Sequence, residues 1–575
     1  MISFSQLSPR KQALLAQSIA HLETRWDESS SMLFLREDGI EQHGSRATAY
    51  YALALLIRNA AGDAERANRA ICAVLALQRL NPNEIWHGTF ANSAEQPQPV
   101  ASCIDMTRLT PEARWQGDVL WERVTMAFRD RILADPALKA DERKLSNMLA
   151  QSLRDVYPVV WETYDPNWRE FIFAIFALIL EEFDQLLPAS TVARMESAAR
   201  EGLRGARRRA ESGLTPLNTN VKVLHAFIFD AYSRRFLDSE LAEYAAAFSA
   251  RLLAEYRELH AVAEFNSPTY NGVVLSYTGL LRTRGGSAPV RELGAALEAG
   301  LWADFADFYN PAMRNLCGPF SRAYDMTMDG TAFPMLFYLG LEEIPEDRLP
   351  PYSGEAESAC ILCLTETAIP ESVKPLLTAS RPERTVTRSF RELAERGDPR
   401  ANRGLCTATA WISDELMLGA VSGSTNTSYQ LHAASGCWKN RDGSLSTLRL
   451  RRRTRENELV HMRTVFLDMK AEKQLLSGTV QNGTPRPIRL SWEIDSPWAA
   501  RGSFRENEWQ VGGLECRYRM LRIGPNTTGK TEVSLFTEIR SEREVWLSAE
   551  LAPGETMEMR LMFSTENKSS IGGNP

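Results

Sequence analysis

The sequence of 575 residues lacks an uninterrupted apolar run of about 18 residues, the length that a membrane-spanning helix needs. Its longest apolar run, Phe171–Leu180, is followed directly by Glu181 and Glu182, which is typical of a buried helix. Residues 1–20 include Arg10 and Lys11 where a secretion signal would need an apolar segment. The chain as written is therefore expected to be cytoplasmic, or secreted or periplasmic if a leader has been removed.

Cysteine is also sparse, with eight residues scattered along the chain, so the sequence does not have the disulfide framework of a small secreted protein. Cys360 and Cys363 form a C-x-x-C pair, but no second pair or histidine cluster follows at zinc spacing. The pair is interpreted as buried thiols one turn apart on a short helix. A phosphate-binding loop with its lysine, a G-x-S-x-G motif and an H-E-x-x-H motif are all absent. No metal and no cofactor are predicted.

Charge of one sign does not dominate either: 66 basic and 73 acidic residues give a net charge of -7, which does not favour nucleic-acid binding. What the chain does contain is aromatic side chains, with 13 Trp, 15 Tyr and 23 Phe. They suit a carbohydrate-binding cleft, and they equally suit the core of a large protein. The length predicts two or three packed domains.

Helical periodicity runs through the first 340 or so residues, where apolar residues recur every three or four positions. Helices that follow Asn- and aromatic-rich turns begin near Asn167, Asn220 and Asn271, about 50 residues apart, which is one helical hairpin each. Six such hairpins favour a closed (α/α)6 toroid, because a ring needs no capping repeats. The twelve predicted helical segments are Leu14–Leu22, Tyr50–Ile57, Ile71–Leu80, Val119–Ile132, Leu145–Val156, Phe171–Leu187, Val192–Leu203, Val221–Phe236, Leu241–Leu259, Val273–Leu281, Val290–Phe308 and Ala332–Leu339.

Later in the chain the period changes to two. Segments such as Ile488–Trp492, Cys516–Met520 and Met557–Phe563 alternate apolar with polar residues, which predicts an antiparallel β-sandwich with one wet face. The expected protein is therefore multidomain: an (α/α) toroid over 1–345, a proline-rich linker over 346–400 with one short helix, and a β-sandwich over 401–575. Two arginine runs, Arg207–Arg209 and Arg449–Arg455, are interpreted as solvated surface rather than as sites that steer an anionic glycan.

The turns that precede the inner helices of such a ring are candidates for a functional site. Inner helices run parallel, so their amino ends gather at one mouth and offer unpaired N–H groups to an anion. Asn, Asp, Ser and Thr are also ordinary helix caps, which is a sufficient explanation for any single turn. Capping does not explain why large aromatic and imidazole side chains accompany several of the turns, and these are Tyr164, Trp168, Tyr270, Tyr324, His43 and His87.

The order of helical half, linker and sandwich resembles polysaccharide lyases of the toroid type, including the heparinase II/III-like and alginate-lyase-like groups. The turns Glu264-Phe-Asn-Ser-Pro-Thr-Tyr and Gly318-Pro-Phe-Ser-Arg-Ala-Tyr are similar to segments of that class and of lyases acting on rhamnosyl-glucuronate linkages. This resemblance implies β-elimination at a uronic acid of an acidic glycan. The uronate carboxylate must be neutralised by Asn, Arg or His, while Tyr or His acts as base and acid.

On this basis Tyr270 or Tyr324 is the expected base-acid, and Asn220, Asn266 and Arg322 are expected to hold the carboxylate. His225 lies among apolar residues, so a core position is favoured over substrate contact. The catalytic candidates are Tyr270, Tyr324, Arg322, Asn220 and His87, and the substrate-binding candidates are His43, Asn167, Trp168, Asn218, Asn266, Asn271 and His225.

Two other functions stay open. A glycoside hydrolase would need a pair of carboxylates across the scissile bond. A glycan-binding protein without catalysis would use the Tyr and Arg side chains only to stack and pair. No nucleic-acid or membrane partner is predicted.

Overall fold

A computed structural model describes residues 2–37, 40–82, 84, 86–99, 165, 167–212, 217–328, 335–337, 339–341, 358–392, 405–424, 426, 428–460, 462, 465–525, 527 and 529–565. These residues divide into two compact units, a helical unit within 1–104, 160–306 and 327–378, and a sheet unit within 307–326 and 379–575. In the described part of the chain, no helix combines the length and the apolar character that crossing a membrane requires.

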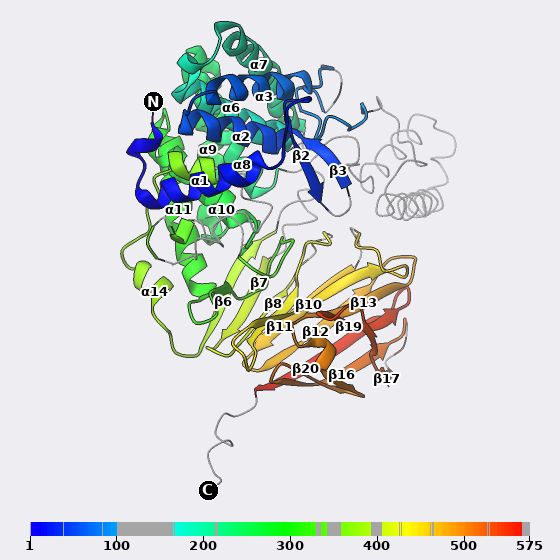
Figure 1. The fold of residues 1–575 in the computed structure, drawn as a ribbon. Helices are drawn as coiled ribbons and strands as arrows, with labels where there is room; N and C mark the ends of the chain where they lie inside the picture. The colour runs from blue at the N-terminus through cyan, green and yellow to red at the C-terminus, as the bar shows by residue number, and fades with distance from the viewer. Residues whose placement is uncertain are drawn as a thin grey trace, which may run out of the picture. The chain divides into compact units, whose positions relative to one another are not determined.

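The helical unit contains long helices and a small three-stranded antiparallel sheet (Figure 1). Helix α6 is apolar on all sides, and residues 169–180 are all buried, as expected from the apolar run Phe171–Leu180. The elements are α1 (Pro9–Glu23), β1 (Trp26–Asp27), β2 (Met32–Glu37), β3 (Ile40–Gly44), α2 (Ser45–Arg58), α3 (Asp63–Ala76), α6 (Trp168–Glu182), α7 (Ala189–Ser212), α8 (Thr219–Phe236), α9 (Ser239–Leu259), α10 (Tyr270–Arg284), α11 (Ala288–Phe308), α13 (Ala359–Leu364) and α14 (Lys374–Thr378).

Contacts among these helices form a closed circuit. Helix α2 contacts α6, α6 contacts α8, α8 contacts α10, α10 contacts α13, and α13 contacts α2 again. Helices α3, α7 and α9 each contact a member of this circuit. The circuit closes through α13, which lies in the predicted linker over 346–400 and not in the predicted toroid over 1–345. The six-hairpin toroid stays a prediction, because the helices expected at 119–132 and 145–156, and most of that expected at 332–339, lie outside the described residues.

The inner helices run in the same direction. At one end, the Trp168 Nε1 group of α6 donates to Ser45 Oγ of α2 at 3.1 Å, so two amino ends are neighbours. At the other end, Arg284 is the last residue of α10 and Glu182 is the last residue of α6, and Arg284 Nη1 lies 2.8 Å from Glu182 Oε1. Arg234, near the end of α8, pairs with Glu181 of α6. The amino ends of α2, α6, α8 and α10 therefore point the same way, and we call this end of the unit the mouth. An opening there that holds a substrate stays a prediction.

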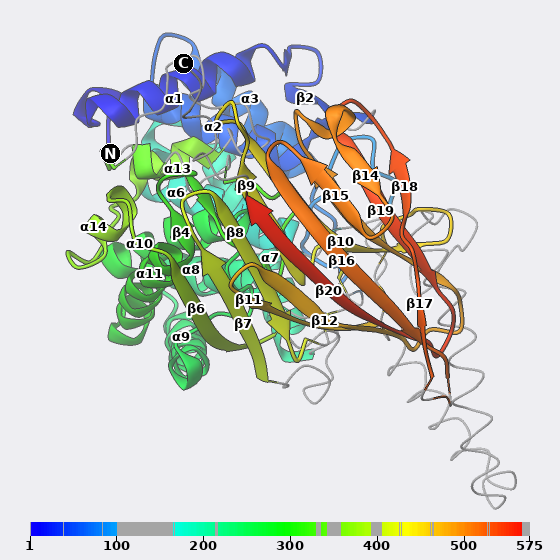
Figure 2. The same cartoon turned by 90° about the horizontal axis from the view of Figure 1, so that it is seen from below.

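The sheet unit is a sandwich of two antiparallel sheets (Figure 2). One sheet has the order β18-β19-β13-β10-β9-β8-β7-β6 and the other β11-β12-β20-β16-β15-β14, with β17 paired to β16, and β11 packs against β7, β8 and β9. The strands are β6 (Arg384–Arg391), β7 (Leu405–Ile412), β8 (Leu416–Ser422), β9 (Ala434–Lys439), β10 (Leu445–Thr454), β11 (Val465–Glu472), β12 (Leu475–Asn482), β13 (Ile488–Asp495), β14 (Ser503–Arg505), β15 (Glu508–Val511), β16 (Leu514–Ile523), β17 (Lys530–Glu532), β18 (Phe536–Ile539), β19 (Glu544–Leu551) and β20 (Thr556–Thr565).

The two sheets differ in how much of them meets water. In β11 buried and exposed residues alternate without exception, which is the predicted pattern of a strand with one wet face. In β10 the last five residues are all buried. The prediction that Arg449–Arg455 forms solvated surface is therefore wrong for Arg451, Arg452 and Arg453, which are 5%, 4% and 8% exposed. Strand β10 lies inside its sheet, between β9 and β13, and its arginines reach internal acceptors.

Several further elements differ from the sequence-based expectation. Strand β6 lies within 346–400, so the sheet unit begins before the end of the predicted linker, and a short hairpin of β4 (Tyr309–Asn310) and β5 (Asn315–Leu316) also belongs to this unit. The three strands β1 to β3 were not predicted. Cys360 and Cys363 lie buried on α13, as expected, and burial raises the pKa of the Cys363 thiol to about 12.

Candidate functional site

The twelve candidate residues are distributed over both units. Ten belong to the helical unit, whereas Arg322 and Tyr324 belong to the sheet unit. Each group is therefore described within its own unit.

The amino ends of α2 and α6 form the first part of the mouth. Trp168 is partly exposed, and the guanidinium carbon of Arg46 lies 4.9 Å from the centre of a Trp168 ring. A cation held on an aromatic face in this way is attracted by the ring. Arg46 was not among the predicted residues. It follows directly after Ser45 at the start of α2, where it resembles any helix-surface arginine in the sequence.

The amino end of α8 forms the second part, where Asn220 is bound by an internal carboxylate. The Asn220 backbone N–H donates to Glu264 Oε2 at 2.7 Å, and its side-chain Nδ2 donates to both oxygens at 2.8 and 2.7 Å. Thr219 Oγ1 in turn accepts the Glu264 backbone N–H at 3.2 Å. Both Asn220 and Glu264 are buried. Glu264 thus occupies the place at Asn220 that was predicted for a uronate carboxylate.

Replacing Asn220 with aspartate should test this pair. Two buried carboxylates at this distance must share a proton, so the pKa of the pair in the folded state rises above its unfolded value. Stability is then lost as pH rises above the unfolded pKa, and we expect a destabilisation of about 2–4 kcal/mol at pH 7 that becomes smaller near pH 4. Urea unfolding at both pH values measures it. Asn218→Asp is the matched control, because Asn218 is the partly exposed N-cap of α8 and aspartate caps equally well. Equal losses in both variants would contradict the pairing.

The turn before α10 supplies the third part of the mouth. Tyr270 is the first residue of α10 and is partly exposed, and its backbone N–H donates to Ser267 Oγ at 3.0 Å. Asn271 is buried beside it, and Asn266 is held in a left-handed conformation at φ 52°. Asparagine tolerates this backbone region better than most residues. Three polar side chains are thus concentrated at one helix start.

Asn167 and His225 belong to a buried polar cluster around Glu170. Asn167 Oδ1 accepts from Arg209 Nη2 at 2.9 Å, and His225 Nδ1 lies 3.6 Å from Glu170 Oε1. Burial opposes the ionisation of Glu170, but Arg169 and Arg209 outweigh it, so the pKa of Glu170 is lowered. Burial lowers the pKa of His225, which is fully enclosed. His225 thus has no exposed surface to offer a substrate. The prediction that Arg209 lies on the solvated surface is wrong, because Arg209 is 1% exposed and belongs to this buried cluster.

His87 is anchored against α7 rather than lying on an open rim. Its Nε2 lies 3.0 Å from Glu201 Oε2, and its carbonyl oxygen accepts from Arg169 Nη1 at 2.5 Å. This close approach needs Gly205, where a Cβ would lie 1.9 Å from the His87 carbonyl oxygen. The imidazole is 6% exposed, so its role in this structure is to connect a loop to a helix.

His43 bridges two acidic residues. Its Nδ1 lies 2.5 Å from Glu95 Oε1 and its Nε2 lies 3.2 Å from Asp27 Oδ2. The backbone N–H of His43 also donates to Glu95 Oε2 at 3.0 Å. These contacts fix the imidazole between β1 and the loop around Glu95, as a structural connection beside the start of α2.

In the sheet unit, Arg322 and Tyr324 are presented on the segment that follows β5. Arg322 Nε donates to Gln430 Oε1 at 2.6 Å, and Tyr324 is 51% exposed, which is high for an aromatic residue. The Tyr324 carbonyl oxygen lies 3.5 Å from Arg449 Nη1 of β10. The described residues contain no group of three or more His, Cys, Asp or Glu side chains that could hold a metal ion.

Comparison with known proteins identifies a family but no activity. Among solved structures, the chondroitin AC lyase of Streptomyces coelicolor A3, in complex with chondroitin sulphate, aligns over 96% of this chain and 83% of that chain with 11% sequence identity and a TM-score of 0.34. A TM-score of this size does not establish a shared fold. No curated protein sequence matches. A domain of unknown function, DUF8769, matches residues 12–108 and 149–339, together half of the chain, and the chain therefore belongs to the DUF8769 family.

Proposed function

We propose that this protein is a lyase that cleaves a uronate-containing glycan by β-elimination, with the mouth of the helical unit as its site. One observation carries the proposal: the inner helices run parallel, so the amino ends that carry Trp168 and Arg46 point the same way as the amino end that carries Tyr270 and Asn271. The partial positive charge of the helix ends, the amide donors, the cation and the phenol are the groups that the reaction demands.

The chemistry assigns a role to each group. The uronate carboxylate receives hydrogen bonds from Asn266, Asn271 and the Arg46 guanidinium, which stabilise the enolate-like intermediate. Tyr270 removes the C5 proton, the electron pair forms the C4–C5 double bond, and the C4–O bond breaks. The departing oxygen takes a proton, for which the Tyr270 hydroxyl is the nearest proposed donor. Tyr270 begins α10, so it lies at the helix end that carries the partial positive charge.

Asn220 enters this proposal as a positioning residue. Its donors are taken up by Glu264, so it holds the turn before α10 in place and does not itself bind the uronate. Glu264 is engaged by the same three hydrogen bonds, which disfavours it as one of the two carboxylates that a hydrolase would need.

A screen of uronate-containing polysaccharides tests the proposal. Elimination creates an unsaturated uronate that absorbs in the ultraviolet, whereas hydrolysis adds water and creates no such absorbance. Absorbance growth with one of the acidic glycans is expected. Reducing ends that appear without absorbance would replace the lyase by a hydrolase, and binding without turnover would leave a glycan-binding protein.

A further inference from the structure

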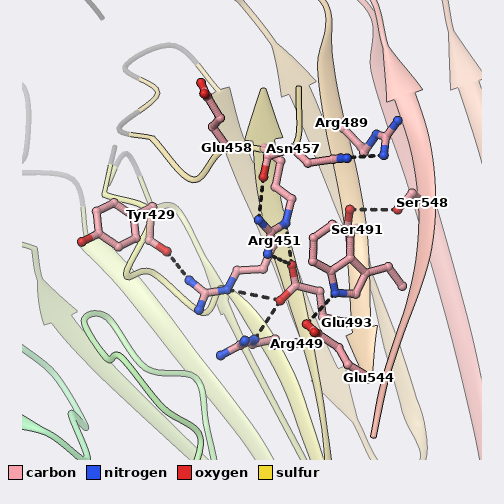
Figure 3. Close-up of polar contacts among 12 residues, drawn as sticks. Tyr429, Arg449, Arg451, Asn457, Glu458, Arg489, Ser491, Glu493, Glu544 and Ser548 are labelled. Carbon is pink, nitrogen blue, oxygen red and sulfur yellow. Dashed lines mark hydrogen bonds and ion pairs between the residues drawn. The ribbon is translucent and has the colours of Figure 1, made fainter. Parts of the chain in front are cut away.

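Three arginines of β10, Arg449, Arg451 and Arg453, converge on one carboxylate in the sheet unit, and Figure 3 labels the first two of them beside Glu493. Arg449 Nε lies 3.0 Å from Glu493 Oε2, Arg451 Nε lies 3.8 Å from the same oxygen, and Arg453 Nε donates to Glu493 Oε1 at 2.7 Å. These alternate residues share one face of the strand. Glu493 stands directly opposite Arg449 on β13, and it is 2% exposed. Three positive charges therefore share a single negative one.

Arg451 is the least satisfied of the three. Its side chain is 5% exposed, its Nη1 donates to the Tyr429 carbonyl oxygen at 2.5 Å, and its Nε has no hydrogen-bond partner among the residues that the structure describes. Burial, together with the positive charge of Arg449, lowers the pKa of Arg451 to about 9. A buried guanidinium normally has its hydrogen bonds filled, because an unmade one costs free energy.

Of the described residues drawn around the cluster, Glu544 and Trp546 do not supply the missing negative charge. Glu544 Oε1 accepts the Trp546 Nε1 group at 2.7 Å, so this carboxylate has a partner of its own. The Trp546 ring lies under two cations, with the guanidinium carbons of Arg453 and Arg540 at 4.0 and 4.4 Å from its centre. The ring holds Arg453 in place and adds no charge.

We propose that Arg449, Arg451 and Arg453 form a binding site for an oxyanion, the carboxylate or sulfate group of an acidic ligand, which pairs with the two positive charges that Glu493 leaves over. The planar fork of a guanidinium suits such groups, since it can donate two parallel hydrogen bonds to two oxygens. The site lies on the sheet unit and is independent of the elimination chemistry proposed for the helical unit. A purely structural cluster would need no added anion.

Calorimetric titration of the full chain with sodium sulfate and, separately, with sodium glucuronate tests the site. Ionic strength is held constant with sodium chloride, so that general screening does not change. Both Arg451→Met, which removes the most buried guanidinium, and Arg449→Gln, which leaves the buried groups in place, should weaken binding at least about tenfold. Arg519→Gln, an exposed arginine that pairs with Glu532 at 3.4 Å in the other sheet, is the matched control and should bind as the unchanged protein does.

Each outcome decides the matter. Stronger binding of sulfate or of glucuronate identifies the group that the site prefers. No heat from either salt in the unchanged protein, or equal weakening in Arg449→Gln and Arg519→Gln, would overturn the proposal. If Arg451→Met fails to fold, Arg449→Gln alone provides the comparison. Loss of elimination in a Tyr270 variant that still binds the anion would show the two proposals to be separate.

Discussion

Replacing Tyr270 with phenylalanine should lower the turnover of an acidic glycan by about 10²-fold or more, which is the usual contribution of a positioned acid-base group. The substitution removes one hydroxyl from the first residue of α10 and leaves the ring, so the helix should form as before. The loss should appear in kcat rather than KM, because the phenol acts in the transition state. Initial rates of ultraviolet absorbance at saturating substrate measure it.

Tyr324→Phe provides the matched comparison, since Tyr324 is the other predicted base and its ring is half exposed in the sheet unit. With Tyr270 as base, this variant keeps its kcat. The opposite pattern would move the base to Tyr324. Full activity in both variants would contradict a tyrosine base altogether.

Replacing Glu493 with glutamine should produce the largest loss of stability. The substitution keeps the shape of the side chain but leaves Arg449, Arg451 and Arg453 facing one another without a carboxylate. Removing one partner of a buried charge pair typically costs about 3–5 kcal/mol, because the remaining charge stays desolvated. The urea midpoint of the transition followed by tryptophan fluorescence should shift downward accordingly.

Glu538→Gln is the control for this experiment. Glu538 pairs with Arg489 at 3.1 Å, but its side chain is 26% exposed, so water replaces much of the lost interaction. We expect a loss below about 1 kcal/mol. Similar midpoints for the two variants would mean that Glu493 does not neutralise the arginines. If the arginines bind an oxyanion, added sulfate should recover part of the stability of Glu493→Gln and none in Glu538→Gln.

Sequence periodicity predicted those elements whose burial pattern repeats along the chain. Helix α6 is buried on all sides along most of its length, and β11 has one buried and one exposed face along its whole length, so the same burial pattern repeats from one end of each element to the other. The burial of Arg451 and Arg453 could not be predicted in this way. Alternating Leu and Arg in β10 is the pattern of a strand with one wet face, and only the neighbouring strands and segments decide whether the second face meets water.

The candidate site shows the same limit. The turn residues Trp168 and Tyr270 were recognisable, because their residue types recur before the helices of a periodic half. The partner of Asn220 was not, since Glu264 lies 44 residues further along the chain and no local pattern links the two. Arg46 was missed because its cation–π contact with Trp168 depends on two helix ends that meet only in the folded chain.

Consecutive arginines in β10 serve opposite sides of the same sheet. Arg451 and Arg453 accompany Glu493, whereas Arg452 points toward the other sheet and donates to the carbonyl oxygens of Val465 at 3.1 Å and Ser428 at 2.6 Å. Deleting a single residue ahead of this strand would exchange the two sets, forcing several cations into the hydrocarbon interior at once and turning the leucines outward. The polar contacts on both faces of β10 thus add to the apolar pattern in fixing the register of this strand.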